Sequence, residues 1–327
     1  MERKWVQQLI AKPELGPFVL LVLELIVFTA MNHEFVSALN ISNALTFTVE
    51  LGLIALAMTL LMTSGEFDLS VGSVFGFSAV LMWTLFNTGS VSLPVAFLIT
   101  IAGAMFIGWV NGILVTKQSI PSFLVTLGML LVVRGTALYT TQGFPQNTWR
   151  ADNQWLASVL VGDTTIFGVR LYMSMLWFVL AALVTHYVLT QTKVGNWIQA
   201  SGGNAPAARA RGVPVSRVKI ALFMFSAAMA SLAGIISSIR TQAANPNSGT
   251  GYELEVIAMV VIGGTVLTGG RGTIVGTVLG ILILRLMRNG IVMVGVPGLA
   301  YNIFIGAIIL GMMVLHNYLE RRHHAGT

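Results

Sequence analysis

Two carboxylates stand close together in a run of small, hydrogen-bonding residues. Glu66 and Asp68 lie within the sequence Ser64–Ser73, between two apolar stretches. A helix broken at this point would leave backbone groups free, and membrane depth allows that only where protein or a water-filled cavity satisfies them. The run therefore predicts either a polar element of a permeation path, with Glu66, Asp68 and Ser70 as its candidates, or an ordinary turn in which Asp68 caps the next helix.

Catalytic or metal chemistry has no support in the sequence. There is no phosphate-binding G-x-x-x-x-G-K-[ST] loop, no H-E-x-x-H pair among the five histidines and no G-x-S-x-G elbow. We therefore expect no catalytic residue, no metal site and no cofactor in this chain. Cysteine is absent, so disulfides cannot contribute to the fold.

The composition is that of a membrane protein. Of 327 residues, 55% are hydrophobic and only 9% are charged, against about 25% charged in soluble domains. Mean hydropathy is +0.82. The net charge of +6 could suggest nucleic acid as a partner, but the basic residues follow the predicted membrane topology, so we expect none.

Apolar stretches predict an all-α polytopic protein with about ten transmembrane helices in one domain, residues 1–327. A span needs about 20 apolar residues to cross about 30 Å of hydrocarbon. The stretches fall near 17–35, 47–64, 69–87, 93–116, 120–140, 171–190, 218–240, 254–268, 273–289 and 298–318. The first of them resembles a signal peptide, but no small-residue cleavage site follows, so we expect an uncleaved span.

Basic residues predict that both ends of the chain face the cytoplasm. With that orientation, twelve of the eighteen Lys and Arg residues fall on the inside and two, Arg150 and Arg170, on the outside, as the positive-inside rule expects. The twelve are Arg3, Lys4, Lys12, Lys117, Lys193, Arg209, Arg211, Arg217, Lys219, Arg271, Arg321 and Arg322.

Two connections are longer than turns. The external one, 141–170, contains Trp149 and Trp155, which suit an interfacial anchor better than a docking surface. The internal one, 191–219, is basic and glycine-rich, and its stretch from Asn204 to Gly212 predicts a short capped helix ended by glycine.

Polar residues inside the expected spans must face protein or water, because facing lipid is costly. Arg134 and Glu50 are the deepest and could pair with each other, either to lock helices or to line a channel. Arg285 and Arg288 are expected to extend toward the outer surface. Glycines 272, 276 and 280, each four apart, predict close helix packing, within the chain rather than against a second copy. The intramembrane polar residues are Glu24, Glu50, Asn111, Arg134, His186, Arg285, Arg288 and Asn289.

These residues resemble the sugar-type permease family of bacterial ABC importers. The run Ser64–Ser73 is similar to the family pattern SGGxDLSVGS, with Glu66 in place of the second glycine. Thr126-Leu127-Gly128 followed by Arg134-Gly135 is a second match. A third runs from Gly195 to Asn289-Gly290 and includes Gly251-Tyr252-Glu253-Leu254 and Gly269-Gly270-Arg271-Gly272.

The resemblance implies a bacterial inner-membrane permease subunit that carries a sugar or sugar-like solute. It implies three partners: a separate ABC ATPase that binds ATP and Mg²⁺, a periplasmic solute-binding protein, and a second permease copy, identical or related. It also implies that the internal segment docks in the ATPase, through Gly195, Gly202, Gly203, Asn204, Ala207, Ala208, Arg209, Arg211 and Gly212. Candidates for the translocation pathway are Glu66, Asp68, Ser70, Arg134, Glu253 and Asn289.

Three alternatives stay open. An ion-coupled secondary transporter would need a mid-membrane carboxylate relay, for which Glu24 and Glu50 are the best candidates. A branched-chain amino-acid permease is the nearest alternative within the ABC class, although the run Asp68–Gly72 favours the sugar branch. An intramembrane enzyme lacks any recognisable nucleophile, base or metal set.

Overall fold

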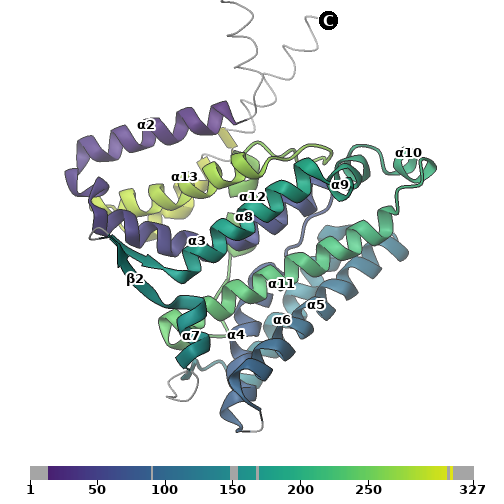
Figure 1. Ribbon diagram of the computed structural model, residues 1–327, viewed down its shortest axis with the longest axis horizontal. Helices are drawn as coiled ribbons and strands as arrows, with labels where there is room; N and C mark the ends of the chain where they lie inside the picture. The colour runs from purple at the N-terminus through teal and green to yellow at the C-terminus, as the bar shows by residue number, and fades with distance from the viewer. Residues whose placement is uncertain (1–13, 90, 148–153, 167–168, 308–309, 312–327) are drawn as a thin grey trace, which may run out of the picture.

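The computed structural model describes residues 14–89, 91–147, 154–166, 169–307 and 310–311 (Figure 1). Trp149, Arg150 and the basic residues at both chain ends lie outside the described residues. The helices, labelled as in Figure 1, are α2 Leu15–Met31, α3 Ala38–Thr63, α4 Val71–Asn87, α5 Leu93–Lys117, α6 Ser122–Thr141, α7 Gln154–Val161, α8 Met173–Gln191, α9 Lys193–Gly203, α10 Ala205–Ala210, α11 Val215–Thr241, α12 Tyr252–Ile262 and α13 Ile274–Met293. Two short 3₁₀ helices are η1 His33–Val36 and η2 Gly298–Ala300.

The fold is all-α and polytopic. Six described helices, α3, α5, α6, α8, α11 and α13, are long and apolar enough to cross a membrane, and α2 and α4 are shorter apolar helices. Two small antiparallel pairs are the only strands among the described residues: β1 Gln146–Asn147 with β4 Ala243–Ala244, and β2 Asp163–Ile166 with β3 Val169–Tyr172. A total of ten spans and the orientation remain predictions.

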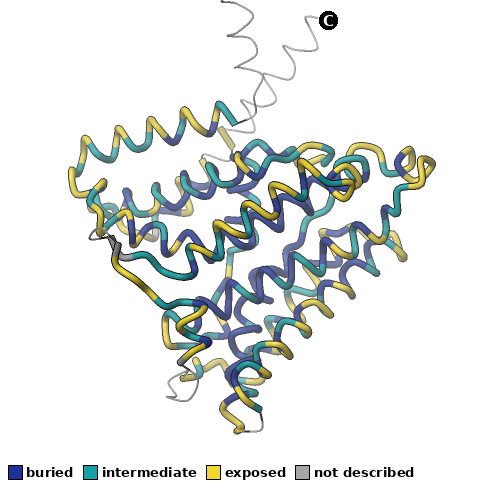
Figure 2. The backbone as a smooth tube through the Cα atoms, in the orientation of Figure 1, coloured by how far each residue is buried: buried dark blue, intermediate teal, exposed yellow. Residues whose placement is uncertain are grey.

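Helix α3 forms the centre of the bundle. In its most apolar stretch 89% of the residues are buried, against 17% to 28% for α5, α6 and α8. Leu51, Ile54 and Met58 of α3 are among the most buried side chains, and α3 contacts α8, α11, α12 and α13. Helices α5, α6 and α8 instead keep apolar faces exposed (Figure 2). In a bilayer, those faces meet lipid tails.

Two pairs of consecutive expected spans are joined by short non-helical segments, and we call each such pair a broken span. Helix α3 ends at Thr63, residues 64–70 are not helical, and α4 begins only at Val71. Likewise, after α11 and the short strand β4, the non-helical segment 245–251 precedes α12, which has only 11 residues. The expected span 254–268 is therefore too long at its end, since the chain leaves the helix at Gly263 and runs as a loop until α13.

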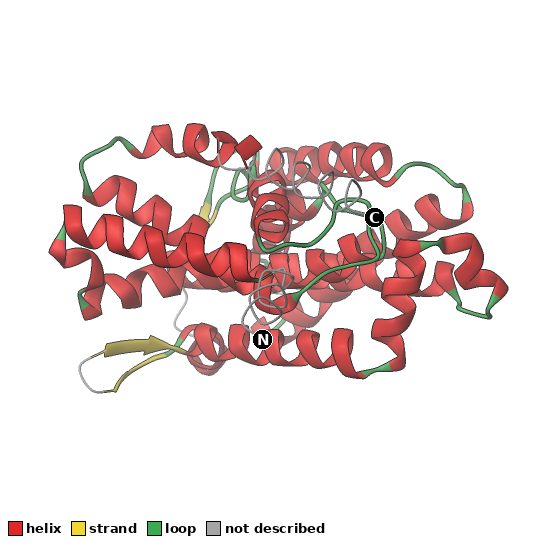
Figure 3. Ribbon diagram, turned by 90° about the horizontal axis from the view of Figure 1, so that it is seen from above, coloured by secondary structure: helices red, strands yellow, loops and turns green. Residues whose placement is uncertain are grey.

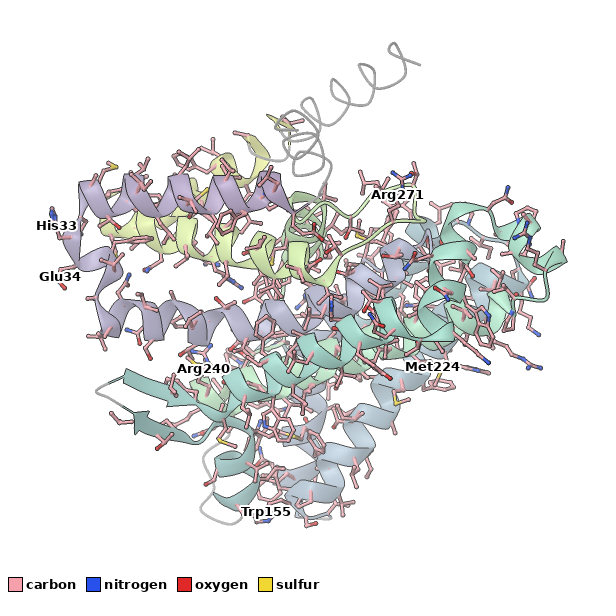
Figure 4. All side chains as sticks on the ribbon, turned by 45° about the horizontal axis from the view of Figure 1, so that its top comes forward. His33, Glu34, Trp155, Met224, Arg240 and Arg271 are labelled. Carbon is pink, nitrogen blue, oxygen red and sulfur yellow. The ribbon has the colours of Figure 1, made fainter. Side chains whose placement is uncertain are left out.

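The connections gather at opposite ends of the bundle. Helices α9 and α10 extend beyond the long helices at one end, where Arg271 also lies, whereas Trp155 of α7 and His33 lie away from it (Figures 1 and 4). The β2–β3 hairpin reaches out beyond the helices (Figure 3). The external connection expected at 141–170 thus contains a helix and a hairpin.

Candidate translocation site

The two broken spans cross each other inside the bundle. At Gly72, in the first turn of α4, a Cβ atom would collide with the backbone carbonyl of Gly249 and with the carboxylate of Glu253. Gly76, one turn later, would meet the carbonyl of Ser248 at 2.6 Å. Glycine is required at both positions because the two backbones touch. We call this contact, between residues 71–76 and residues 245–251, the crossing.

Arg134 of α6 holds the crossing together. Its Nη1 donates to the carbonyl oxygens of Pro246 at 2.6 Å and Ser248 at 2.7 Å, and its Nη2 donates to that of Gly72 at 3.0 Å. The guanidinium therefore satisfies two carbonyls of the non-helical segment, those of Pro246 and Ser248, and adds a bond to the Gly72 carbonyl of α4, well away from either end of α6. The expected pairing of Arg134 with Glu50 is wrong.

A polar network lies at the start of α4. Asp68 Oδ1 accepts from the backbone N–H of Ser70 at 2.8 Å and from its hydroxyl at 2.5 Å, and Asn111 of α5 donates to the same hydroxyl at 3.1 Å. Ser226 of α11 lies beside the carboxylate. Asp68 is fully buried, so it braces the broken connection from within; the N-cap of α4 is Ser70, not Asp68.

Glu253 lies at the first turn of α12 against Gly72, and the Arg134 guanidinium lies one helical turn away against Gly76. Glu253 Oε2 is buried without a hydrogen-bond partner among the described residues. The structure thus brings four of the six pathway candidates, Asp68, Ser70, Arg134 and Glu253, to the crossing and its immediate surroundings. It places Glu66 and Asn289 elsewhere.

Glu66 belongs to a second cluster, near α9 and α10. It accepts a 2.6 Å hydrogen bond from Lys219 Nζ of α11, an ion pair whose side chains are 15% and 13% exposed. The pair lines a cavity of about 230 Å³ with Arg209 of α10 and with Ser119 and Pro121 of the α5–α6 connection. This cavity joins the broken span to the basic internal segment.

Glycines from three separate stretches of the sequence meet beside that cavity. A Cβ on Gly202, near the end of α9, would collide with the carbonyl of Thr63 and lie 2.6 Å from the Gly270 nitrogen. Gly270 N–H donates to the Thr63 carbonyl at 2.8 Å. A Cβ on Gly269 would come within 2.7 Å of Gly65. Gly65, Gly269 and Gly270 have φ values of +85°, +85° and +83°. We call Gly65, Gly202, Gly203, Gly269 and Gly270 the glycine junction.

The short capped helix expected after Asn204 is present as α10. Asn204 Oδ1 accepts from Ala207 N–H at 3.0 Å, and Gly212 follows with φ +83°. Ala208 is buried while Arg209 and Arg211 are exposed. The sequence did not indicate the preceding helix α9. Its N-cap is Thr192, whose hydroxyl accepts a hydrogen bond from the Gly195 N–H. Gly195 packs against the backbone at the end of α8.

The remaining buried charges stabilise helix contacts. Glu50 of α3 pairs with Arg240 of α11, whose Nε donates at 3.0 Å. Arg285 of α13 is only 7% exposed and lies 3.5 Å from Glu255, so it does not extend to the surface as expected. Tyr301 donates to the same carboxylate at 2.7 Å. Nothing in the sequence indicated Glu255 or Tyr301.

Two further expectations have structural outcomes. Asn289 of α13 donates to Asn40 Oδ1 of α3 at 2.8 Å, so it joins two helices away from the crossing. The glycines of α13 and its approach pack within the chain, as expected. A Cβ on Gly272 would strike Thr63, and Cβ atoms on Gly276 and Gly280 would strike the backbone of Gly263 and Met259. Among the described residues, no three His, Asp or Glu side chains gather where they could hold a metal.

Comparison with known proteins identifies relatives of this chain. Residues 40–313 match the family described as the branched-chain amino acid transport system / permease component. The ribose import permease protein RbsC of Escherichia coli K12 is 36% identical over 301 residues, 90% of each chain. RbsC of Bacillus subtilis is 34% identical over 321 residues, 95% of this chain and 94% of that one. The xylose/arabinose import permease protein XylH of Sulfolobus acidocaldarius is 32% identical over 311 residues, 93% and 85%.

No solved structure matches the chain. The family match covers most of the sequence and includes both the crossing and the glycine junction. With six helices able to span a bilayer, the chain is a multi-pass protein of the bacterial inner membrane, and it belongs to the branched-chain amino acid transport system / permease component family.

Proposed function

We propose that this chain is the membrane-spanning permease subunit of an ABC importer and that it moves a sugar or a sugar-like solute. One observation carries the solute class: relatives that align with 90% or more of this chain are named as ribose or xylose/arabinose import permeases. The crossing supports a transport role, because irregular backbone inside a membrane protein marks a path or a binding region.

The energy source in this proposal is a separate ATPase. The chain has no phosphate-binding loop of its own. Helices α9 and α10 form an exposed platform carrying Arg209 and Arg211, which suits docking to a partner. The glycine junction links that platform to the turn after α3, so a push on α9 reaches the broken span directly. On this account, the α9–α10 end is cytoplasmic, a solute-binding protein docks at the opposite end and a second permease copy completes the pathway.

The buried charges weigh against an ion-coupled transporter. Glu50 is held in an ion pair with Arg240, and Glu24 lines a separate, almost wholly apolar cavity between α2 and α13. Neither carboxylate lies at the crossing, so the two do not form a relay along one path. A branched-chain amino acid would bring an ammonium and a carboxylate into the path, yet the Arg134 guanidinium is already engaged by three carbonyls.

The test is to purify the chain together with the products of neighbouring genes and to reconstitute the complex in lipid vesicles. We expect a complex with an ATPase whose hydrolysis rises when the binding protein is loaded with D-ribose or D-xylose. The matched comparison uses the same binding protein loaded with leucine. Stimulation by leucine alone would contradict the sugar assignment, and full uptake driven by an ion gradient without ATPase would contradict the ABC mechanism.

A further inference from the structure

The segment 245–251 exposes polar side chains inside the bundle. Asn247 and Thr250 are both exposed. Their chain neighbours Pro246 and Gly249 are buried. Leu254, in the first turn of α12, is 64% exposed. The segment and the following turn of α12 therefore expose an amide, a hydroxyl and an apolar group, while Gly249 packs against Gly72 of α4.

The depth of this segment follows from its partners. Ser248 and Pro246 accept hydrogen bonds from Arg134, which lies inside α6, and Gly249 touches Gly72 at the start of α4. At this depth, a non-helical backbone with an open Asn247 amide is strongly disfavoured against lipid, because lipid offers no hydrogen-bond partner. The Thr250 hydroxyl donates to the Asn247 carbonyl at 2.7 Å and keeps its oxygen free to accept. The exposed polar groups must meet water or protein.

The chemistry of the exposed groups suits a neutral polyhydroxylated solute. The polar groups are uncharged donors and acceptors, and the nearby Arg134 guanidinium is already bonded to three backbone carbonyls. Sugar hydroxyls can exchange hydrogen bonds with the Asn247 amide and can donate to the Thr250 hydroxyl oxygen, whose proton is donated to the Asn247 carbonyl. The C–H faces of a sugar ring can contact Leu254. Weak, uncharged contacts also allow the solute to leave, as a transport path requires.

From these observations we propose that Asn247, Thr250 and Leu254 line the water-filled sugar path and contact the solute as it passes. The inference rests on the proposed transport function and assigns residues to it. Sequence reasoning gave Asn247 and Thr250 no role, because the run Asn245–Gly251 has the composition of a surface loop, and it named Leu254 only as part of a family motif.

The absence of cysteine in the natural chain makes thiol labelling a clean test. Single substitutions Asn247→Cys, Thr250→Cys and Leu254→Cys are made in the assembled complex in membranes. They are treated with a charged methanethiosulfonate reagent, with and without ATP. The matched control is Leu183→Cys in the middle of α8, a leucine of similar exposure, 62%, on an unbroken apolar helix.

We expect all three path positions to react in at least one nucleotide state and Leu183→Cys to stay unmodified until the protein is denatured. Labelling of Thr250→Cys should then reduce sugar uptake at least fivefold, with the control unchanged. Unreactive thiols at 247 and 250 would show that protein covers the segment and would overturn the inference, as would labelling without loss of uptake. If the unmodified complex moves no sugar at all, the proposed function fails, and reactivity alone still decides whether the segment faces water.

Discussion

The crossing and the glycine junction are both places where backbones touch, but different forces hold them. At the crossing, a guanidinium makes three hydrogen bonds to carbonyls, and two of these carbonyls, of Pro246 and Ser248, lie in a non-helical segment. At the junction, the contact is glycine against glycine with one backbone hydrogen bond, from Gly270 to Thr63, and an ion pair nearby. The comparison indicates that membrane depth decides whether a backbone polar group needs a protein partner. Inside the membrane it needs a fixed partner, whereas at the membrane edge water can take that place.

We therefore expect the two contacts to have different roles, the crossing in stability and the junction in coupling. Breaking the crossing exposes unsatisfied carbonyls, so we expect it to remain intact while the helices around it rearrange. Close packing and one backbone hydrogen bond hold the junction, so we expect it to move more readily than the crossing. We therefore expect changes at the crossing to affect folding most and changes at the junction to affect coupling most.

The largest effect should follow Arg134→Met. The non-helical carbonyls of Pro246 and Ser248 would lose their donor, at about 1–3 kcal/mol for each unsatisfied buried group, so we expect the purified protein to lose about 4 °C or more in thermal midpoint. Arg134→Lys keeps the charge but cannot span three carbonyls, and its loss should be intermediate. Thermal unfolding followed by tryptophan fluorescence measures both. An Arg134→Met protein as stable as the parent would show that the Arg134 hydrogen bonds do not stabilise the crossing.

The junction offers a matched pair of substitutions. A Cβ at Gly202 would collide with backbone atoms of Thr63 and Gly270, whereas at Gly203 the nearest atom is 3.9 Å away. We expect Gly202→Ala to cost about 1–3 kcal/mol of stability by overpacking and to reduce sugar moved per ATP hydrolysed. Gly203→Ala should change neither. Equal behaviour of the two variants, measured in the same vesicles, would show that the junction contact is not tight.

A smaller effect is expected at the ion pair beside the junction. Glu66→Gln or Lys219→Gln should cost about 1 kcal/mol or less, since both side chains retain some exposure. The reversed pair, Glu66→Lys with Lys219→Glu, should recover most of any transport defect. A double-mutant cycle on uptake rates measures the coupling. Independent, additive effects would mean that the pair does not join the two elements functionally.

The smallest effect on stability should come from Arg209→Glu. The side chain is exposed on α10, so the thermal midpoint should hardly change, while association with the ATPase should weaken and become less sensitive to salt. Lys117→Glu, an exposed position at the end of α5 outside the α9–α10 platform, is a control for general loss of basic charge. Unaltered ATPase binding by the Arg209 variant would place the docking surface elsewhere.

The sequence predicted the elements of the crossing only in part. The run Ser64–Ser73 signalled a broken span because carboxylates and small residues interrupt an apolar pattern. The second broken span had no such signal, since Asn245–Gly251 has the composition of a loop and α12 is short. Local composition cannot show that a loop folds back into a bundle.

The charge partners were also beyond the sequence. Glu50 and Arg240 are 190 residues apart, and Arg134 bonds to carbonyls, which every residue carries. The glycines of α13 were predictable because their spacing of four lies along one helix face. The meeting of Gly65, Gly202 and Gly270 was not, because three distant segments contribute to it.

The most direct measurement is D-ribose uptake by vesicles that contain the chain with its ATPase and binding protein. The account predicts that uptake requires ATP on the side of the membrane where α9 and α10 lie. Uptake should stop when the ATPase is omitted, and it should not respond to a proton or sodium gradient. Uptake that persists without ATPase and follows an ion gradient would contradict it.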